Sequence, residues 1–370
     1  RKILISVKMK KIIYKTIVTS TLILFFIILY LSIIGIKTNK FNSRIISQIK
    51  NVAPNIEIKL NDVSAKLNLL TFTIDTKTFG TNLINRNKII KIENIRSKIS
   101  LKSIINNQFA LSRISISTKS MPVKDLISFI RLLNNNPKLF IAEQLIRDGY
   151  IIADIKLEFD EFGKVKNNYK VNGLVNNGKI SLFKKKLSKV NFIFQITNKE
   201  FRLNDIQLLL NNKSIIVPEL IALKKDNEFS ISGKLNSKNL NFKKKDLKNF
   251  IDNEFLVLNL KEIIFSSNSI FSFKIDQDFK FKNINIKSII NLDYLKLKNF
   301  LQLKNNFPNI KDEILFKNQK IELNYSKDRM EIIGSGNIFL QKESDIIKYK
   351  IINNKKNFIF DTSLKISKNP

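Results

Sequence analysis

The residue types that carry most enzyme chemistry are missing from this 370-residue chain, which contains no histidine and no cysteine. Their absence removes the usual imidazole base, thiol nucleophiles, disulfides and zinc sites built from thiolates. The chain also lacks the G-x-S-x-G, Walker A, G-x-G-x-x-G and H-E-x-x-H motifs. We therefore predict that the protein is not an enzyme and has no catalytic residues, no metal site and no cofactor.

Three short motifs come closest to a chemical site. Asp160-Glu161 is a carboxylate pair at a turn, and Asp276 with Asp278 would share one face of a strand. Either pair could contact a cation, but a solvated turn and ion pairing with flanking lysines explain them more simply. Gly334-Ser335-Gly336 is the nearest approach to a phosphate loop, yet strand-like sequence flanks it and no helix start follows. We interpret it as a glycine pair inside a strand.

The chain is strongly basic, with 65 Lys and Arg against 31 Asp and Glu and a net charge of +34. Lysine outnumbers arginine by 56 to nine, and the lysines are spread along the chain without a nucleic-acid-binding motif. Because Lys, Ile and Asn have AT-rich codons, genome composition explains this bias most simply. We predict no nucleic-acid partner, and we expect attraction to anionic lipid head groups of about 1 kcal/mol for each nearby lysine.

The first structural element is the uncharged apolar run Ile17–Ile36, which follows a lysine-rich start. A helix of about 20 apolar residues crosses a bilayer core. The run exceeds the apolar core of a signal peptide, about 7–15 residues, and no clear small-residue cleavage site follows, which favours an uncleaved anchor. We predict a transmembrane anchor at residues 12–37 and, by the positive-inside rule, a basic cytoplasmic tail at residues 1–11.

Two further segments show helical rather than strand spacing. The apolar residues of segment 38–54 fall on one helical face and Ala53-Pro54 ends the element, which predicts an amphipathic connecting helix. Residues 122–147 are predicted to form a helical insertion that begins with a proline. Shorter helices are expected at Lys244–Asp252 and near Tyr294–Asn305.

From residue 55 onward the dominant period of apolar residues is two. This alternation predicts strands with one apolar face and one face of Lys, Asn, Ser and Asp, as in an antiparallel sheet. No linker rich in Gly, Pro or Ser divides the segment, so we predict one elongated β domain at residues 55–370. Because the chain opens with Arg rather than Met and ends without any stop-like feature, we also expect a fragment, truncated at its C-terminus.

The apolar face is the remaining chemical feature, because the chain has 29 Phe and many Ile and Leu residues that something must cover. A second sheet would cover this face in a closed sandwich, whereas acyl chains could cover it in an open groove. The sequence leaves both alternatives open. The candidate groove-lining residues are Ile155, Leu157, Phe159, Phe192, Phe194, Ile196, Phe229, Ile231, Leu256, Leu258, Phe271 and Phe273.

Four features resemble the AsmA-like family of envelope proteins, the group that includes TamB and YhdP. They are the basic start with a single anchor, the strand–turn–strand segment Ile92–Ile127 that leads into a helix, a second such pattern at Phe159–Leu182, and glycine-bearing strands at Met330–Ile351. The resemblance implies a curved, taco-shaped or tubular β-groove with an apolar interior. It also implies a single-pass inner-membrane protein, largely periplasmic, that acts in phospholipid transport between inner and outer membranes or in outer-membrane biogenesis.

The leading hypothesis is therefore an anchored periplasmic β-groove protein whose partners are phospholipid and the inner membrane. Each buried CH₂ gains about 0.8 kcal/mol relative to water, so an apolar lining would lower the cost of moving lipid across an aqueous gap. The alternative is a structural or assembly factor of the envelope that binds no lipid. Such a factor would contact outer-membrane or other envelope proteins through β-strand addition at a sheet edge.

Overall fold

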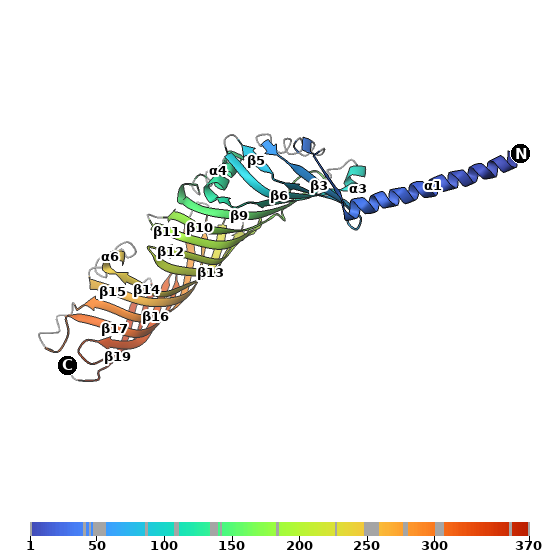
Figure 1. Ribbon diagram of the computed structural model, residues 1–370. Helices are drawn as coiled ribbons and strands as arrows, with labels where there is room; N and C mark the ends of the chain where they lie inside the picture. Colours follow the sequence, from blue (N-terminus) through green and yellow to red (C-terminus); the bar gives the residue numbers. More distant parts are fainter. Residues whose placement is uncertain are drawn as a thin grey trace. The chain divides into compact units, whose positions relative to one another are not determined.

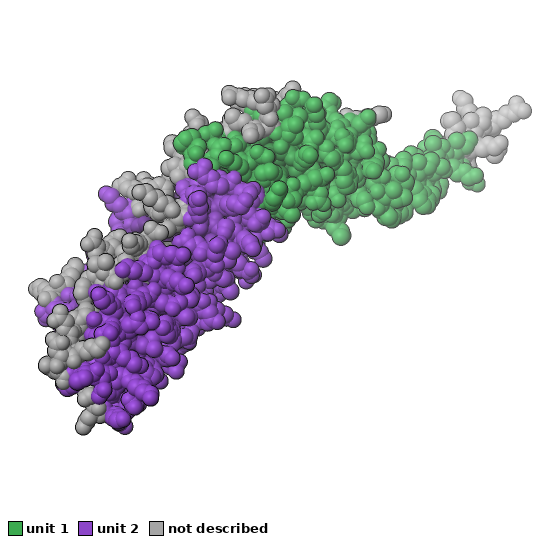
Figure 2. Space-filling view, turned by 60° about the vertical axis from the view of Figure 1, so that its left-hand side comes forward, with its two compact units in different colours: residues 1–144, 150–173 green, residues 145–149, 174–370 purple. Residues whose placement is uncertain are grey.

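The computed structural model describes residues 2–39, 42–43, 46, 57–85, 88–106, 111–133, 140, 143–182, 185–225, 228–247, 259–276, 280–299, 307–354 and 357–368 (Figure 1). The described residues contain twenty strands, all of whose described pairings are antiparallel, and few helices. The predicted fold class, a curved antiparallel β-sheet behind an N-terminal apolar helix, is therefore confirmed. Contacts divide the chain into unit 1, residues 1–144 with 150–173, and unit 2, residues 145–149 with 174–370 (Figure 2).

The N-terminal helix α1 (Lys2–Ile33) is the one helix among the described residues that is long and apolar enough to cross a bilayer. From Lys11 onward most of its side chains are exposed, with Phe25 and Phe26 at 58% and 59%, as expected for a helix that lipid surrounds. The helix ends before the apolar run does, because Gly35 adopts φ +74° and its amide donates to the Tyr30 carbonyl at 3.1 Å. Ile36 therefore belongs to a strand.

Unit 1 is built around a main sheet and a smaller one. The main sheet pairs in the order β1 (Ile36–Thr38), β3 (Asp62–Asn68), β4 (Thr73–Phe79), β6 (Lys88–Ser100), β7 (Leu111–Thr118) and β9 (Ile146–Glu158). The smaller sheet pairs β2 (Glu57–Lys59) with β5 (Asn82–Asn85) and β5 with the start of β6. The short strand β8 (Met121–Pro122) pairs with β9.

Helix α4 (Val123–Leu133) packs against β6 and closes the core of unit 1. The core consists of buried apolar side chains from both elements, including Ile92 of β6 and Phe129 of α4. The helix begins directly after Pro122, as predicted, and residues 134–139 and 141–142 of the predicted insertion lie outside the described residues. Most of segment 38–54 lies outside them as well. A short helix, α3 (Leu101–Ile105), is capped by the Ser100 hydroxyl, which accepts the Ser103 amide at 3.1 Å.

Unit 2 is a sheet that grows in chain order, and Figure 1 shows its curved strands following one another from green to red. Each strand from β11 to β20 pairs with the next. The strands are β10 (Lys170–Leu182), β11 (Lys185–Ile196), β12 (Glu200–Leu210), β13 (Lys213–Lys225), β14 (Glu228–Lys243), β15 (Leu260–Ile275), β16 (Phe281–Lys298), β17 (Glu313–Ser326), β18 (Arg329–Phe339), β19 (Asp345–Asn354) and β20 (Phe358–Lys365).

Local sequence explains the connections of unit 2. Asn211 and Asn212 both adopt positive φ and join β12 to β13, as the turn geometry of a two-residue hairpin requires. Helix α6 (Lys244–Leu247) covers part of the helix predicted at Lys244–Asp252, whose remainder lies outside the described residues. The helix predicted near Tyr294–Asn305 is wrong as far as Lys298, because those residues continue β16. Leu295 there pairs with Ile263 of β15.

Asparagines in the middle of strands bend the sheet of unit 2. Asn239 of β14 has φ 48° and Asn318 of β17 has φ 50°, and each sits at a shift in strand register. On β14, Ser237 and Leu240 are three residues apart, yet their partners on β15 are only two apart. The extra residue is a β-bulge, which bends the strand and keeps the apolar side chains on one face on both sides of it.

Candidate functional site

Strand register assembles one continuous apolar face on unit 2. Phe194 pairs with Leu203, and Phe273 pairs with Ile231. Paired residues of an antiparallel sheet lie on the same face. One row of pairs joins Phe194, Leu203, Leu220, Gly233, Phe271, Ile286 and Tyr325, and the next joins Ile196, Phe201, Ala222, Ile231 and Phe273. We call these two rows, with their aromatic neighbours Phe192, Phe229 and Phe281, the apolar face.

Aromatic rings contact one another along this face. The ring centroids of Phe273 and Phe281 lie 5.3 Å apart, and those of Phe271 and Phe273 lie 6.0 Å apart. Phe201 and Phe229 are also 6.0 Å apart, in an edge-to-face arrangement. Pairs of this kind contribute about 0.5–1.5 kcal/mol beyond their burial. Most of these rings are half-buried, so they present apolar surface that the described protein leaves partly open.

Glycines let rings lie flat against the strands. A Cβ on Gly233 would lie 2.7 Å from the ring of Phe271, and a Cβ on Gly334 would lie 2.2 Å from the ring of Tyr349. The Gly334-Ser335-Gly336 motif lies within β18, in agreement with its interpretation as a strand glycine pair. Burial raises the pKa of the Tyr349 hydroxyl above its ordinary value.

No second sheet packs onto the apolar face among the residues that the structure describes, because each strand of unit 2 contacts mainly its neighbours in chain order. This arrangement differs from the closed sandwich, in which a facing sheet supplies the cover. Comparison with protein-family models, curated proteins and solved structures finds no match to this chain.

Seven of the twelve candidate residues lie together on the apolar face of unit 2. Ile155 and Leu157 lie in unit 1, where they pair with Ile116 and Ile114, and Phe159 forms an isolated bridge with Val165. Leu256 and Leu258 fall outside the described residues. Sequence reasoning missed Phe201, which completes the face, because the apolar phase of β12 changes at Asp205, a residue with φ 53°. An Asp or Asn at the position where the apolar alternation changes phase is the sequence signal that could have identified Phe201.

The carboxylates singled out in the sequence have structural roles. Asp160 accepts hydrogen bonds from the amides of Phe162 and Lys164, both at 2.9 Å, and so closes its own turn. Asp276 forms an ion pair with Lys282 at 3.1 Å, while Asp278 lies outside the described residues. The interpretations as a solvated turn and an ion pair therefore agree with the geometry.

Clustered ion pairs neutralise several lysines of unit 2. Glu313 pairs with Lys261 and also with Lys296, whose Nζ lies 2.6 Å from a carboxylate oxygen. Hydrogen bonds from these two lysines lower the pKa of Glu313. Glu228 bridges Lys274 and Lys282 in the same way, and these bonds lower its pKa. Because the pairs are exposed, they contribute little stability.

Proposed function

We propose that this chain is a membrane-anchored β protein whose apolar face shelters phospholipid acyl chains in transport between inner and outer membranes. The observation that carries the proposal is the continuous, half-buried aromatic face, over which the described residues place no second sheet. Large exposed apolar surfaces mark binding sites. An acyl chain is a matching occupant because it is apolar, long and flexible.

The bends of the strands favour a groove on the side of the sheet that carries the apolar face. Ile206, Val217, Leu240 and Leu292, which lie beside the bends, are buried, whereas Asn239, at a bend itself, is exposed. Side chains on the inside of a bend crowd together and those on the outside spread apart. We therefore infer that the sheet of unit 2 curves toward its apolar face. Each CH₂ of an acyl chain held there would gain about 0.8 kcal/mol relative to water.

The location is also a proposal. Helix α1 supplies the anchor, and the lysines before it favour a cytoplasmic N-terminus by the positive-inside rule. Both β units would then lie in the periplasm, as the resemblance to AsmA-like proteins implies. An inner-membrane anchor would tether the chain to a source of phospholipid. Movement along the face would be passive, since neither the sequence nor the described geometry supplies a catalytic group that could drive it.

We expect phospholipid to co-purify with a variant that begins at Gly35. This start retains β1 and its pairing with β3 but removes the anchor, which would carry lipid by itself. The measurement is mass spectrometry of organic extracts from the purified protein, together with uptake of a fluorescent phospholipid. A folded protein that carries no phospholipid and takes up none would contradict the proposed function.

A second candidate function is strand addition at β20, the last of the described strands. All eight residues of β20 are exposed, with Phe358 at 65% and Phe360 at 61%, and among the described strands β20 pairs only with β19. An exposed apolar edge is a template for another strand. An assembly factor would use this edge and bind no lipid. Absence of lipid, combined with crosslinks from Phe360 to an envelope protein, would favour this alternative.

A further inference from the structure

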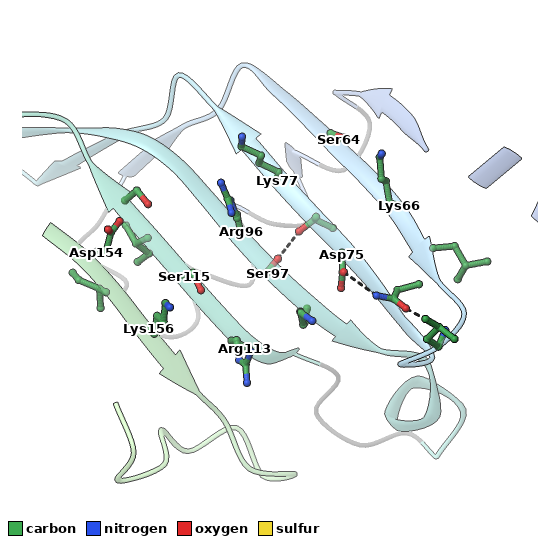
Figure 3. A pocket seen from close by; sticks show the side chains of 18 of the residues that line it. Ser64, Lys66, Asp75, Lys77, Arg96, Ser97, Arg113, Ser115, Asp154 and Lys156 are labelled. Atoms are coloured by element: carbon green, nitrogen blue, oxygen red, sulfur yellow. Dashed lines mark hydrogen bonds between the residues drawn. The ribbon is translucent and has the colours of Figure 1, made fainter. Parts of the chain in front are cut away.

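Unit 1 contains a hollow of about 1120 Å³ (Figure 3), and its lining combines charged and hydroxyl side chains with apolar ones such as Leu67, Ile116 and Ile155. Strands β3, β4, β6, β7 and β9 each contribute at least one cation to it. The cations are Lys66, Lys77, Arg96, Lys98, Arg113 and Lys156, which we call the cationic hollow. Hydroxyl groups of Ser64, Ser115 and Ser117 lie among them, and Asp75 and Asp154 are the only carboxylates in the described lining.

Strand register places like charges directly opposite one another in this hollow. Lys77 pairs with Arg96 across β4 and β6, and Lys98 pairs with Arg113 across β6 and β7. Like charges in directly opposed positions destabilise a sheet. The same row continues from Arg96 through Ser115 to Lys156. Directly opposed cations lower the stability of the sheet when no ligand is bound. Their presence here indicates that a bound anion offsets the repulsion between them.

The carboxylates nearby leave most of this charge uncompensated. Among the described residues, Arg96, Lys98 and Lys156 have no ion-pair partner, whereas Arg113 pairs with Glu158 at 2.5 Å. Asp75 lies opposite both Lys66 and Lys98 in the strand register, but its carboxylate accepts hydrogen bonds from the hydroxyl of Thr73 and the side-chain amide of Asn68. In unit 2, by contrast, Glu228, Glu313 and Glu331 each bridge two cations.

The hollow also lies at the end of the membrane helix. Ser32 of α1 contributes to its lining, and Lys66 Nζ donates a hydrogen bond of 3.0 Å to the carbonyl of Ile33 at the end of α1. After two intervening residues, β1 begins at Ile36 and pairs with β3 in the same sheet. A helix that spans a bilayer ends at the level of the lipid head groups. The anion most available to this hollow is therefore a phosphate of the surrounding bilayer.

We propose that the cationic hollow binds the head groups of anionic phospholipids in the bilayer that anchors α1. Lysine and arginine side chains supply charge-assisted hydrogen bonds to phosphate oxygens, and the serine hydroxyls supply neutral ones. This contact holds unit 1 against the membrane surface. It depends on α1 as an anchor, but it does not depend on acyl chains reaching the apolar face of unit 2, so either proposal can fail without the other.

The test uses the full chain in nanodiscs of phosphatidylcholine, with or without phosphatidylglycerol. Native mass spectrometry counts the phosphatidylglycerol molecules that the released protein retains. We expect a combined Arg96→Glu, Lys98→Glu and Lys156→Glu variant to lower phosphatidylglycerol retention roughly a hundredfold, because each basic residue near an anionic surface contributes about 1 kcal/mol. The matched control, Lys234→Glu, Lys287→Glu and Lys320→Glu, changes net charge equally at exposed positions of unit 2 and should retain the lipid.

Three outcomes would overturn the proposal: unchanged retention in the hollow variant, equal loss in the control variant, or displacement of the lipid by inorganic phosphate, which would identify a soluble anion.

A second measurement leaves the cations intact, in case the hollow variant fails to fold. The chain contains no tryptophan, so Ser115→Trp places a single tryptophan in the hollow. Energy transfer from it to a dansyl-labelled anionic lipid should exceed transfer to a labelled zwitterionic lipid. Equal transfer would also overturn the proposal.

Discussion

Replacing Phe273 by aspartate is expected to abolish uptake of fluorescent phospholipid while leaving the protein folded. The ring of Phe273 contacts Phe271 and Phe281 at the middle of the apolar face, so a carboxylate there would force an acyl chain to contact a charge. Because Phe273 is half-buried, the carboxylate can still reach water. The measurement compares lipid uptake with thermal unfolding of the same preparation, with the anchor removed before Gly35.

Ser272→Asp is the matched control, since it introduces the same charge one residue away, on the opposite face of β15. We expect its lipid uptake to equal that of the unmodified protein. Global unfolding of the Phe273 variant would instead indicate a closed core, and equal loss in both variants would indicate a charge effect unrelated to the face. Phe194 is unsuitable for this test, because its side chain is only 6% exposed and a charge there would unfold the sheet.

The variant Gly336→Val is expected to lower the free energy of unfolding by about 1–3 kcal/mol, as overpacking does in a tightly packed site. A Cβ at this position would lie 2.6 Å from the backbone oxygen of Asn318 and 2.7 Å from the Cα of Gln319. Both atoms belong to the bulge that bends β17, so the bulge itself would have to move. Denaturant unfolding of the anchor-free chain measures the effect.

The neighbouring substitution Ser335→Val serves as the control for Gly336→Val. Ser335 is exposed within the same strand, and valine suits a strand position. We expect its free energy of unfolding to stay within about 0.5 kcal/mol of the unmodified protein. Equal stability of the two variants would show that the close approach at Gly336 does not constrain the bend, and the inferred curvature would lose its support.

The sequence alone determined the elements whose signals are local. The second half of helix α1 follows from one uncharged apolar run, and the β strands follow from alternation that covers most of the remaining chain. Hydropathy and the period of apolar residues are properties of neighbouring residues. The sequence therefore contains all the information needed to predict these elements. The same holds for the helix after Pro122 and for the glycine pair at Gly334 and Gly336.

The pairing between strands, and not the local sequence pattern, sets which residues share a surface. The bulges at Asn239 and Asn318 change the phase of alternation, and this change decides which face each later side chain joins. The helix expected near Tyr294 failed because pairing with β15 outweighed a weak local preference for helix. The cationic hollow brings together Lys66 and Lys156, which are far apart in the chain, through successive strand pairings. Register between strands depends on contacts that no local pattern contains, and for this reason both surfaces emerge only in the folded sheet.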